Sequence, residues 1–258
     1  NIELEKKTAF TIRLRSPNDG HTVFNDMIYG NISISNSEID DFIIARSDGS
    51  PVYNFTNVID DQSMKITHVV RGEDHISNTP KQILIYKAFN WEPPIFAHLP
   101  MILGSDKKRL SKRHGAPGVQ SLKDKGYYTD SIHNYLALLG WNPKNEKEVL
   151  DADELINLFS FDQVQKKGAA WDEKKLHWLS GQHVQNKNSQ FLLDQIRLLD
   201  SVWGKNSDIS TLINIINSLK PRAKSLHEFI AKSKHFFIAP DTYDEAERLK
   251  AWPDSNAT

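Results

Sequence analysis

The sequence predicts an α/β fold over residues 1–145, followed by an all-α helical bundle over residues 146–258. In the first part, strand-like segments alternate with helical ones, which is typical of α/β proteins. After the polar stretch at residues 142–145, apolar residues recur at helical spacing instead. The 258 residues, 39% of them hydrophobic, are enough for one large or two modest domains.

Three segments of the first part have the composition of strands, at residues 10–14, 42–45 and 66–71. A further apolar run at residues 96–103 indicates a buried strand or the approach to one, and a turn follows it. A turn signal also precedes residues 52–61, which can be helical. Thr79 is expected to be the N-cap of another helix, with Pro80 at its first position.

The second part carries signals for the starts of helices. Asp151 is expected to cap one helix, and Ser225 with Glu228 is expected to form a capping box before another. Leu192, Ile196 and Leu199 are expected to share one face of a third helix.

The 32 basic residues nearly balance the 33 acidic ones, but five of the seven side chains at residues 107–113 are Lys or Arg. No apolar run approaches the roughly 18 residues of a membrane span, and no secretory pattern is present. The absence of cysteine excludes disulfides and thiolate metal sites. The ten histidines show no zinc spacing, so we expect no metal site. We expect a soluble, cytoplasmic protein.

The basic segment contains Arg109, Ser111, Lys112 and Arg113, on a loop that leaves the apolar run through the turn at residues 104–106. Lys is a flexible point charge that can follow a phosphate, and Arg can bind two phosphate oxygens at once. The loop is therefore suited to a leaving pyrophosphate. By composition alone, a solvated face or a nonspecific nucleic-acid patch would be preferred.

The neighbourhood of this loop resembles a known family. Residues 109–113 are similar to the KMSKS signature of class I aminoacyl-tRNA synthetases. They match the Lys-Leu-Ser-Lys-Arg variant typical of bacterial-type glutamyl-tRNA synthetases, with Arg109 in place of the first Lys. The preceding segments, at residues 69–80, 91–94 and 97–100, match that family in order and spacing.

The resemblance implies the second half of a Rossmann-type class I synthetase catalytic domain, followed by a helical bundle that contacts tRNA and by the start of an anticodon-binding region. It implies ATP-dependent ligation of L-glutamate to tRNA(Glu) through a glutamyl-adenylate, with release of AMP and pyrophosphate. The expected partners are tRNA(Glu), L-glutamate and ATP, accompanied by Mg²⁺, and the expected state is a monomer. The resemblance also implies that Lys112 is the main catalytic residue. Ser111, Arg109 and Arg113 would assist it in stabilising the departing pyrophosphate.

The expected glutamate site combines a helix and the end of a strand. On a helix, Tyr53 and Asn57 would face the same way; the alternative is an amphipathic helix whose Tyr covers the core and whose Asn is solvated. Arg71 can bind a carboxylate or form a salt bridge to Glu73 or Asp74. The resemblance implies that Tyr53 and Asn57 line the amino-acid pocket, and that Arg71 reads the side-chain carboxylate of glutamate.

Asp74 and His75 stand next to this pocket in the sequence. Taken alone, they fit the approach to the following helix better than acid–base chemistry. The resemblance implies that they bind ATP, together with Leu103 and Lys112. No general base is required, because carboxylate attack on the α-phosphate of ATP depends mainly on positioning and charge stabilisation.

One signature of the family, the HIGH motif, does not occur in these 258 residues. We expect a fragment that lacks the N-terminal part with that motif and most or all of the anticodon-binding domain, and that is inactive alone. Two rival functions are a noncatalytic tRNA-binding module and the paralogue that glutamylates queuosine in tRNA. The paralogue lacks the helical bundle, and a noncatalytic module has no physical reason to keep the pocket. An organelle is the alternative to bacterial cytoplasm, because mitochondrial glutamyl-tRNA synthetases are of the bacterial type.

Overall fold

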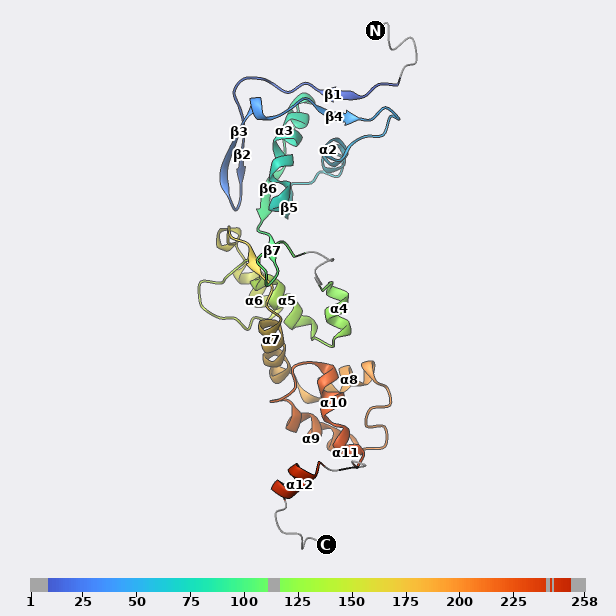
Figure 1. Ribbon diagram of the computed structural model, residues 1–258. Coiled ribbons are helices and arrows are strands. Elements are labelled where there is room, and N and C mark those ends of the chain that lie inside the picture. The colour runs from blue at the N-terminus through green and yellow to red at the C-terminus, as the bar shows by residue number, and fades with distance from the viewer. Residues whose placement is uncertain (1–8, 111–116, 240–241, 243, 252–258) are drawn as a thin grey trace. The chain divides into compact units, whose positions relative to one another are not determined.

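The computed structural model describes residues 9–110, 117–239, 242 and 244–251 (Figure 1). The chain divides into two compact units. Unit 1 comprises residues 1–114, 138–146 and 157–171, and unit 2 comprises residues 115–137, 147–156 and 172–258. The predicted division near residue 145 lies at one of the points where the chain passes from one unit to the other.

Unit 1 is built on a four-stranded sheet in the order β3-β2-β6-β5. Its strands are β2 (His21–Asp26), β3 (Gly30–Ser35), β5 (His68–Gly72) and β6 (Ile95–Leu99). The sheet is mixed, because β2 and β3 are antiparallel whereas β6 is parallel to both β2 and β5. Two small sheets pair β1 (Ile12–Leu14) with β4 (Phe42–Ala45) and β7 (Ile102–Leu103) with β8 (Ala169–Ala170).

The strand predicted at residues 42–45 is confirmed as β4. The strands predicted at residues 10–14 and 66–71 are confirmed as β1 and β5, each of which begins two residues later, and β5 also ends one residue later. The apolar run at residues 96–103 forms two strands, β6 and β7, with Pro100 and Met101 between them. Proline has no N–H to donate to a ladder, which explains the interruption.

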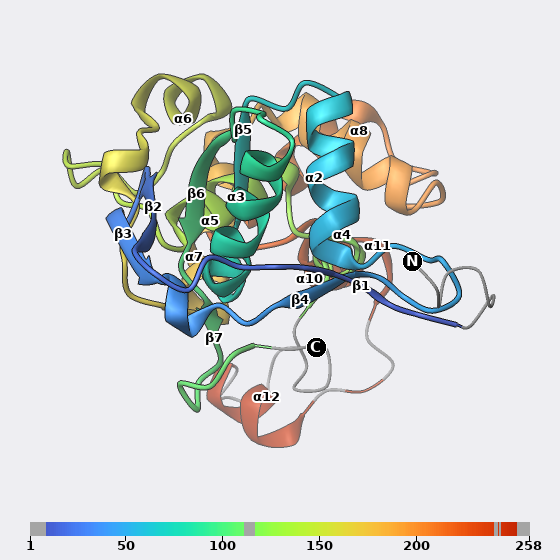
Figure 2. The ribbon, with the colours of Figure 1, turned by 90° about the horizontal axis from the view of Figure 1, so that it is seen from above.

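Two helices pack in unit 1, α2 (Tyr53–Ser63) and α3 (Thr79–Ala88), and Figure 2 shows α3 beside β5 and β6. Short 3₁₀ turns occupy η1 (Asn36–Glu38), η2 (Glu73–Asn78) and η4 (Phe161–Gln163). Two apolar clusters hold these layers together. One contains Ile39, Phe42, Val58, Leu84, Ile85 and Tyr86, and the other contains Phe24, Ile83 and Phe96.

The prediction that Thr79 caps α3 is wrong. The preceding residue, Asn78, holds the N-cap position without a side-chain cap bond, and Thr79 is the first helical residue. Because η2 runs directly into α3, the backbone at Asn78 is already in the right-handed helical region rather than extended. Thr79 is fully buried, and its hydroxyl serves another group. Pro80 does lie in the first turn of α3.

The described residues of unit 2 form helices. They are α4 (Val119–Asp124), α5 (Thr129–Leu138), α6 (Ala152–Leu158), α7 (Glu173–Asn186), α8 (Ser189–Leu199), α9 (Ile209–Leu219), α10 (Leu226–Lys232), α11 (Lys234–Phe237) and α12 (Glu245–Ala251). Their core includes Leu192 and Ile196, which are fully buried as their spacing predicts. Leu199, predicted on the same face, is 44% exposed, because it is the last residue of α8 and lies outside this core. Within the described residues, no helix has the length and apolar character required to cross a membrane.

The two predicted caps behave differently. Asp151 accepts the backbone N–H of Glu154 at 2.8 Å, and Glu154 accepts that of Asp151 at 3.2 Å, which is a complete capping box. Ser225 accepts the backbone N–H of Glu228 at 3.4 Å, as predicted. The Glu228 carboxylate, however, accepts the N–H of Lys224 instead of returning to Ser225. The predicted box at Ser225 is therefore only half formed.

Candidate functional site

Arg71, on the edge strand of the four-stranded sheet in unit 1, is held by neutral partners. It lies on β5, in register with His98 on the parallel strand β6. Its Nε donates to His98 Nε2 at 3.2 Å, and its Nη2 donates to Thr79 Oγ1 at 2.8 Å and to Gln82 Oε1 at 2.9 Å. Among the described residues, the buried Nη1 group has no hydrogen-bond partner. Burial lowers the pKa of Arg71 from its ordinary value, and the neighbouring Tyr53 opposes this shift.

Neither carboxylate next to Arg71 in the sequence is bonded to it. Glu73 accepts hydrogen bonds from the Tyr29 hydroxyl and, at 3.0 Å, from the backbone N–H of Met101. Burial raises the pKa of Tyr29, and Glu73 raises it further. Asp74 is paired with a different arginine. The salt-bridge interpretation of Arg71 is therefore wrong, and its charge remains available to a ligand.

A buried hydrogen-bonded pair, Asp26 and His98, lies next to Arg71. Asp26, the last residue of β2, and His98 are both fully enclosed, and Asp26 Oδ2 is 2.6 Å from His98 Nδ1. Burial lowers the pKa of His98, although Asp26 opposes that shift. The Arg71 guanidinium carbon also lies 5.6 Å from the centroid of the Phe96 ring, within the range of a cation–π contact.

Tyr53 and His75 are brought together from different elements. Tyr53 is the first residue of α2, and its hydroxyl lies 3.3 Å from Nδ1 of His75 on η2. Tyr53 is 51% exposed, so it does not cover the core as the alternative interpretation required. Asn57 lies one turn further along α2 and is half-buried. Among the described residues, Asn57 is not bonded to Tyr53 or Arg71.

Arg109 and Asp74, 35 residues apart in the sequence, form an ion pair. A hairpin carries Arg109 there, because Leu103 and Arg109 form an antiparallel bridge and Leu110 N–H donates to Ile102 O at 2.8 Å. The Arg109 Nη2 group lies 2.8 Å from Asp74 Oδ2, with the two side chains 62% and 30% exposed. The hairpin thus brings Arg109, which was predicted to stabilise pyrophosphate, into contact with Asp74, which was predicted to bind ATP.

The remaining residues predicted for pyrophosphate, namely Ser111, Lys112 and Arg113, lie outside the described part of the chain. The structure therefore leaves their predicted roles as they stand.

The supporting residues around Arg71 were not singled out from the sequence as functional. They include Asp26 and His98, and Gln82, whose Nε2 donates to Asn54 Oδ1 at 3.1 Å. One signal in the sequence could have identified Asp26. The alternation along β2 buries Thr22, Phe24 and Asp26 together, which directs a carboxylate into an apolar layer. A carboxylate is seldom buried unless it is hydrogen-bonded or paired.

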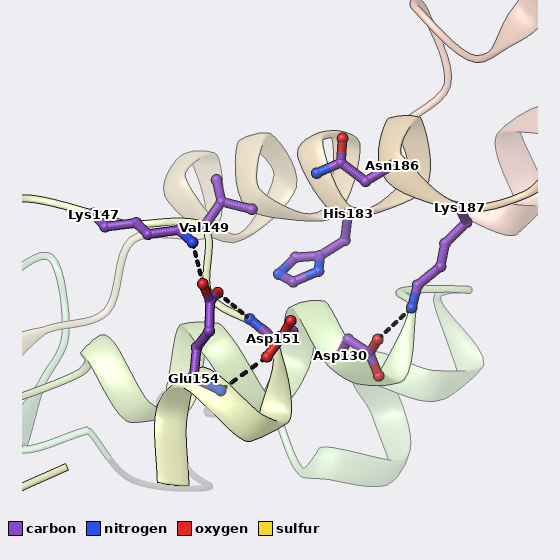
Figure 3. A pocket seen from close by; sticks show the side chains of 8 residues that line it. All are labelled: Asp130, Lys147, Val149, Asp151, Glu154, His183, Asn186 and Lys187. Atoms are coloured by element: carbon purple, nitrogen blue, oxygen red, sulfur yellow. Dashed lines mark hydrogen bonds and ion pairs between the residues drawn. The ribbon is translucent and has the colours of Figure 1, made fainter. Parts of the chain in front are cut away.

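Unit 2 contains a pocket of about 460 Å³ (Figure 3). It is lined by Asp130, Lys147, Val149, Asp151, Glu154, His183, Asn186 and Lys187. Its charges are largely matched within the wall, because Lys187 bonds Asp130 at 2.7 Å and Lys147 bonds Glu154. Burial lowers the pKa of His183, whose Nε2 lies 2.9 Å from Asn134 Oδ1. No residue predicted for the glutamate or ATP site lines this pocket.

A family model described as tRNA synthetases class I (E and Q), catalytic domain, matches residues 2–178. The chain belongs to this family. The expectation of a class I synthetase catalytic domain is confirmed, with a mixed sheet and packed helices.

Curated relatives of this synthetase chain include the glutamate–tRNA ligase of Moorella thermoacetica, 43% identical over 242 residues. That match covers 91% of this chain and 49% of the relative. The glutamate–tRNA ligase of Trichlorobacter lovleyi is 42% identical over 242 residues, covering 93% of this chain and 51% of the relative. The chain thus spans about half the length of the curated relatives that it matches.

Solved structures similar to this synthetase chain include a glutamate tRNA ligase from Elizabethkingia meningosepticum in complex with its amino acid. It has a TM-score of 0.86 and 33% identity, over 96% of this chain and 53% of that one. The glutamate-tRNA synthetase of Elizabethkingia anophelis has a TM-score of 0.83 and 32% identity, over 96% of this chain and 54% of that one.

Proposed function

We propose that this protein ligates L-glutamate to tRNA(Glu) in an ATP-dependent reaction through a glutamyl-adenylate, releasing AMP and pyrophosphate. The observation that supports this proposal most directly is the state of Arg71. A largely buried guanidinium is bonded to three neutral side chains and retains an Nη1 group without a partner among the described residues. A carboxylate would satisfy both its charge and its remaining donor.

L-Glutamate supplies such a carboxylate on its side chain. Glutamine would place a neutral amide against the same cation, so the site favours the acid. Tyr53, which is half-exposed, lies near Arg71 with its hydroxyl 3.3 Å from His75 Nδ1, and Asn57 follows one turn later on α2. We assign the amino-acid pocket to Tyr53, Asn57 and Arg71, as the relatives' activity suggests.

The ATP site is proposed at Asp74, His75, Leu103 and the basic loop. The contact between Arg109 and Asp74 supports this grouping, because it joins the hairpin of Leu103 to η2, which carries both Asp74 and His75. Lys112, with Ser111, Arg109 and Arg113, is proposed to stabilise the departing pyrophosphate. Among the described residues, no group of three or more acidic or histidine side chains could hold a metal ion. Mg²⁺ is proposed to arrive with ATP, because it is commonly held through phosphates and a few carboxylates.

The finer organisation also belongs to this proposal. We infer that residues 1–145 form the C-terminal part of the Rossmann-type catalytic domain and that residues 146–258 form a helical bundle that contacts tRNA. Residues 157–171 are an exception to the predicted all-α bundle, because they belong to unit 1 and contain the short strand β8. The helices of unit 2 and their shared apolar core support the second assignment. A monomer in the cytoplasm is the expected state.

The decisive experiment is glutamate-dependent exchange of pyrophosphate into ATP by the full-length gene product, with and without tRNA(Glu). We expect exchange with L-glutamate but not with L-glutamine. Arg71→Ala should lower kcat/KM for L-glutamate about a hundredfold or more, because it removes one partner of a buried charge pair. Arg46→Ala, which removes an exposed arginine of a turn, is the matched control and should retain exchange. Normal exchange by Arg71→Ala would contradict the assigned site.

A further inference from the structure

We propose that the buried Asp26–His98 pair positions Arg71 for the carboxylate that it binds. The inference rests on the proposed function, because it concerns how the residue proposed to read glutamate is held. Asp26 and His98 are positioning residues, since Arg71 stands between them and the ligand.

Asp26 is surrounded by hydrogen-bond donors. Its Oδ1 accepts the backbone N–H groups of Ile28 and Tyr29, each at 2.9 Å. Its Oδ2 accepts the backbone N–H of His98 at 3.1 Å and faces His98 Nδ1 at 2.6 Å. An ionised carboxylate can only accept, so His98 Nδ1 must carry a hydrogen. The environment of Asp26 therefore selects one form of the imidazole.

The selected form makes the other ring nitrogen an acceptor. Burial disfavours the charged imidazolium, so a hydrogen on Nδ1 leaves a lone pair on Nε2. Arg71 Nε, which can only donate, lies 3.2 Å from that lone pair. If the hydrogen were on Nε2 instead, two donors would face each other. Donation from His98 Nδ1 to Asp26 therefore allows His98 Nε2 to accept a hydrogen bond from Arg71.

The chain of contacts fixes the plane of the guanidinium. His98 holds Nε, while Thr79 and Gln82 hold Nη2, so the rigid fork is fixed by two of its nitrogens. The remaining nitrogen, Nη1, keeps its donors for a ligand. The charge of Asp26 also opposes the lowering of the Arg71 pKa, to a smaller extent than Tyr53 and Asp61, without contacting the guanidinium. Had Asp26 contacted Arg71 directly, it would have competed with the ligand.

Asp26→Asn tests the first contact with almost no change in size. The new amide can place its N–H₂ group where Oδ2 faced His98 Nδ1. An N–H₂ group donates, so Nδ1 would have to accept, and the hydrogen of the imidazole would move to Nε2. In the full-length gene product, we expect binding of L-glutamate, measured by calorimetry, to weaken about tenfold or more. The KM for L-glutamate in pyrophosphate exchange should rise in parallel while the KM for ATP stays near its original value. Binding of L-glutamate as in the wild type would overturn the proposal.

Two substitutions of His98 separate positioning from packing. His98→Gln can place an amide oxygen near the position of Nε2, where it accepts from Arg71. His98→Asn can place an amide nitrogen near Nδ1, where it keeps the bond to Asp26 but leaves Arg71 without an acceptor. We expect L-glutamate to bind His98→Gln more tightly than His98→Asn. Equal losses, or the reverse order, would mean that His98 only fills space.

A measurement on the unaltered protein removes any dependence on how the variants fold. In the full-length gene product with ¹⁵N-labelled histidine, the His98 resonances should show a hydrogen on Nδ1 and none on Nε2 at neutral pH. The opposite tautomer, or an imidazolium, would overturn the proposal.

Arg71→Ala distinguishes a failure of the proposed glutamate site from a failure of the positioning role of Asp26 and His98. If Arg71→Ala binds L-glutamate normally, the proposed function of the site fails. If Arg71→Ala loses binding while Asp26→Asn retains it, only the positioning role fails.

Discussion

Arg71 shows how a single residue can remain charged inside a fold and still be ready for a ligand. Its hydrogen bonds to His98, Thr79 and Gln82 satisfy geometry but contribute no negative charge. Burying a cation without an anion costs free energy, and here burial already lowers the pKa of Arg71. A bound carboxylate would offset part of that cost, so ligand binding should also stabilise unit 1.

Two buried histidines predict how the stability of the protein depends on pH. Burial lowers the pKa of both His98 and His183. Below pH ~6.5, the ordinary value for histidine, the unfolded chain therefore binds protons that the native protein does not. The free energy of unfolding should decrease as the pH falls from 7.5 to 5, by up to about 1.4 kcal/mol per pH unit for each histidine.

Urea unfolding at a series of pH values measures this decrease. His183→Gln retains an amide donor for Asn134 but cannot titrate, so its free energy of unfolding should change less steeply over the same range. A slope identical to that of the wild type would show that His183 does not contribute.

At the scale of the element, α7 depends on the residue that precedes it. Asp172 accepts the backbone N–H groups of Lys174 at 2.9 Å and Lys175 at 3.1 Å, which would otherwise lack partners at the helix start. The same helix contributes Leu176, Leu179 and other fully buried side chains to unit 2. The cap therefore supports packing as well as local helix formation.

Asp172→Ala should lower the free energy of unfolding of unit 2 by about 1 kcal/mol, the usual effect of losing an N-cap. Asp172→Asn retains an acceptor at the same position and should lose only a fraction of that amount. Circular dichroism at 222 nm during urea unfolding measures both. If the Ala and Asn variants are equally stable, the cap does not stabilise α7.

At the scale of the whole molecule, the division into two units predicts separate stabilities. Ile196 is fully buried in the core of unit 2, and Ile196→Ala should cost about 2–5 kcal/mol through lost burial and the cavity left behind. We expect faster amide hydrogen exchange in α8, α9 and α10, with little change in β5 and β6. Leu198→Ala, on the same helix but at a side chain that is 78% exposed, is the control and should change little. Equal loss of protection in both units would mean that they unfold as one.

The sequence was most informative where structure depends on near neighbours. The strand at residues 42–45 and the caps Asp151 and Ser225 are determined by local composition, and all three were found. Thr79 was misassigned because η2 runs directly into α3 and places Asn78 at the N-cap, while the Thr79 hydroxyl bonds Arg71, a partner that helix-start rules do not consider. The motif resemblance identified Arg71, but its support by Asp26 and His98 joins residues 72 positions apart. Only the pairing of β5 with β6 brings that support next to Arg71.

The strand position of Arg71 has a consequence for how the protein can change over evolutionary time. Ligand-binding residues on loops can be replaced with little effect on the rest of a protein. Arg71 instead shares its contacts with three other elements, namely β6, α3 and, through Asp26, β2. A mutation that altered ligand preference here would also disturb the register and packing of the sheet. Preference for an acidic ligand and integrity of the fold are therefore inherited together, and a switch to a neutral ligand would require several coordinated substitutions.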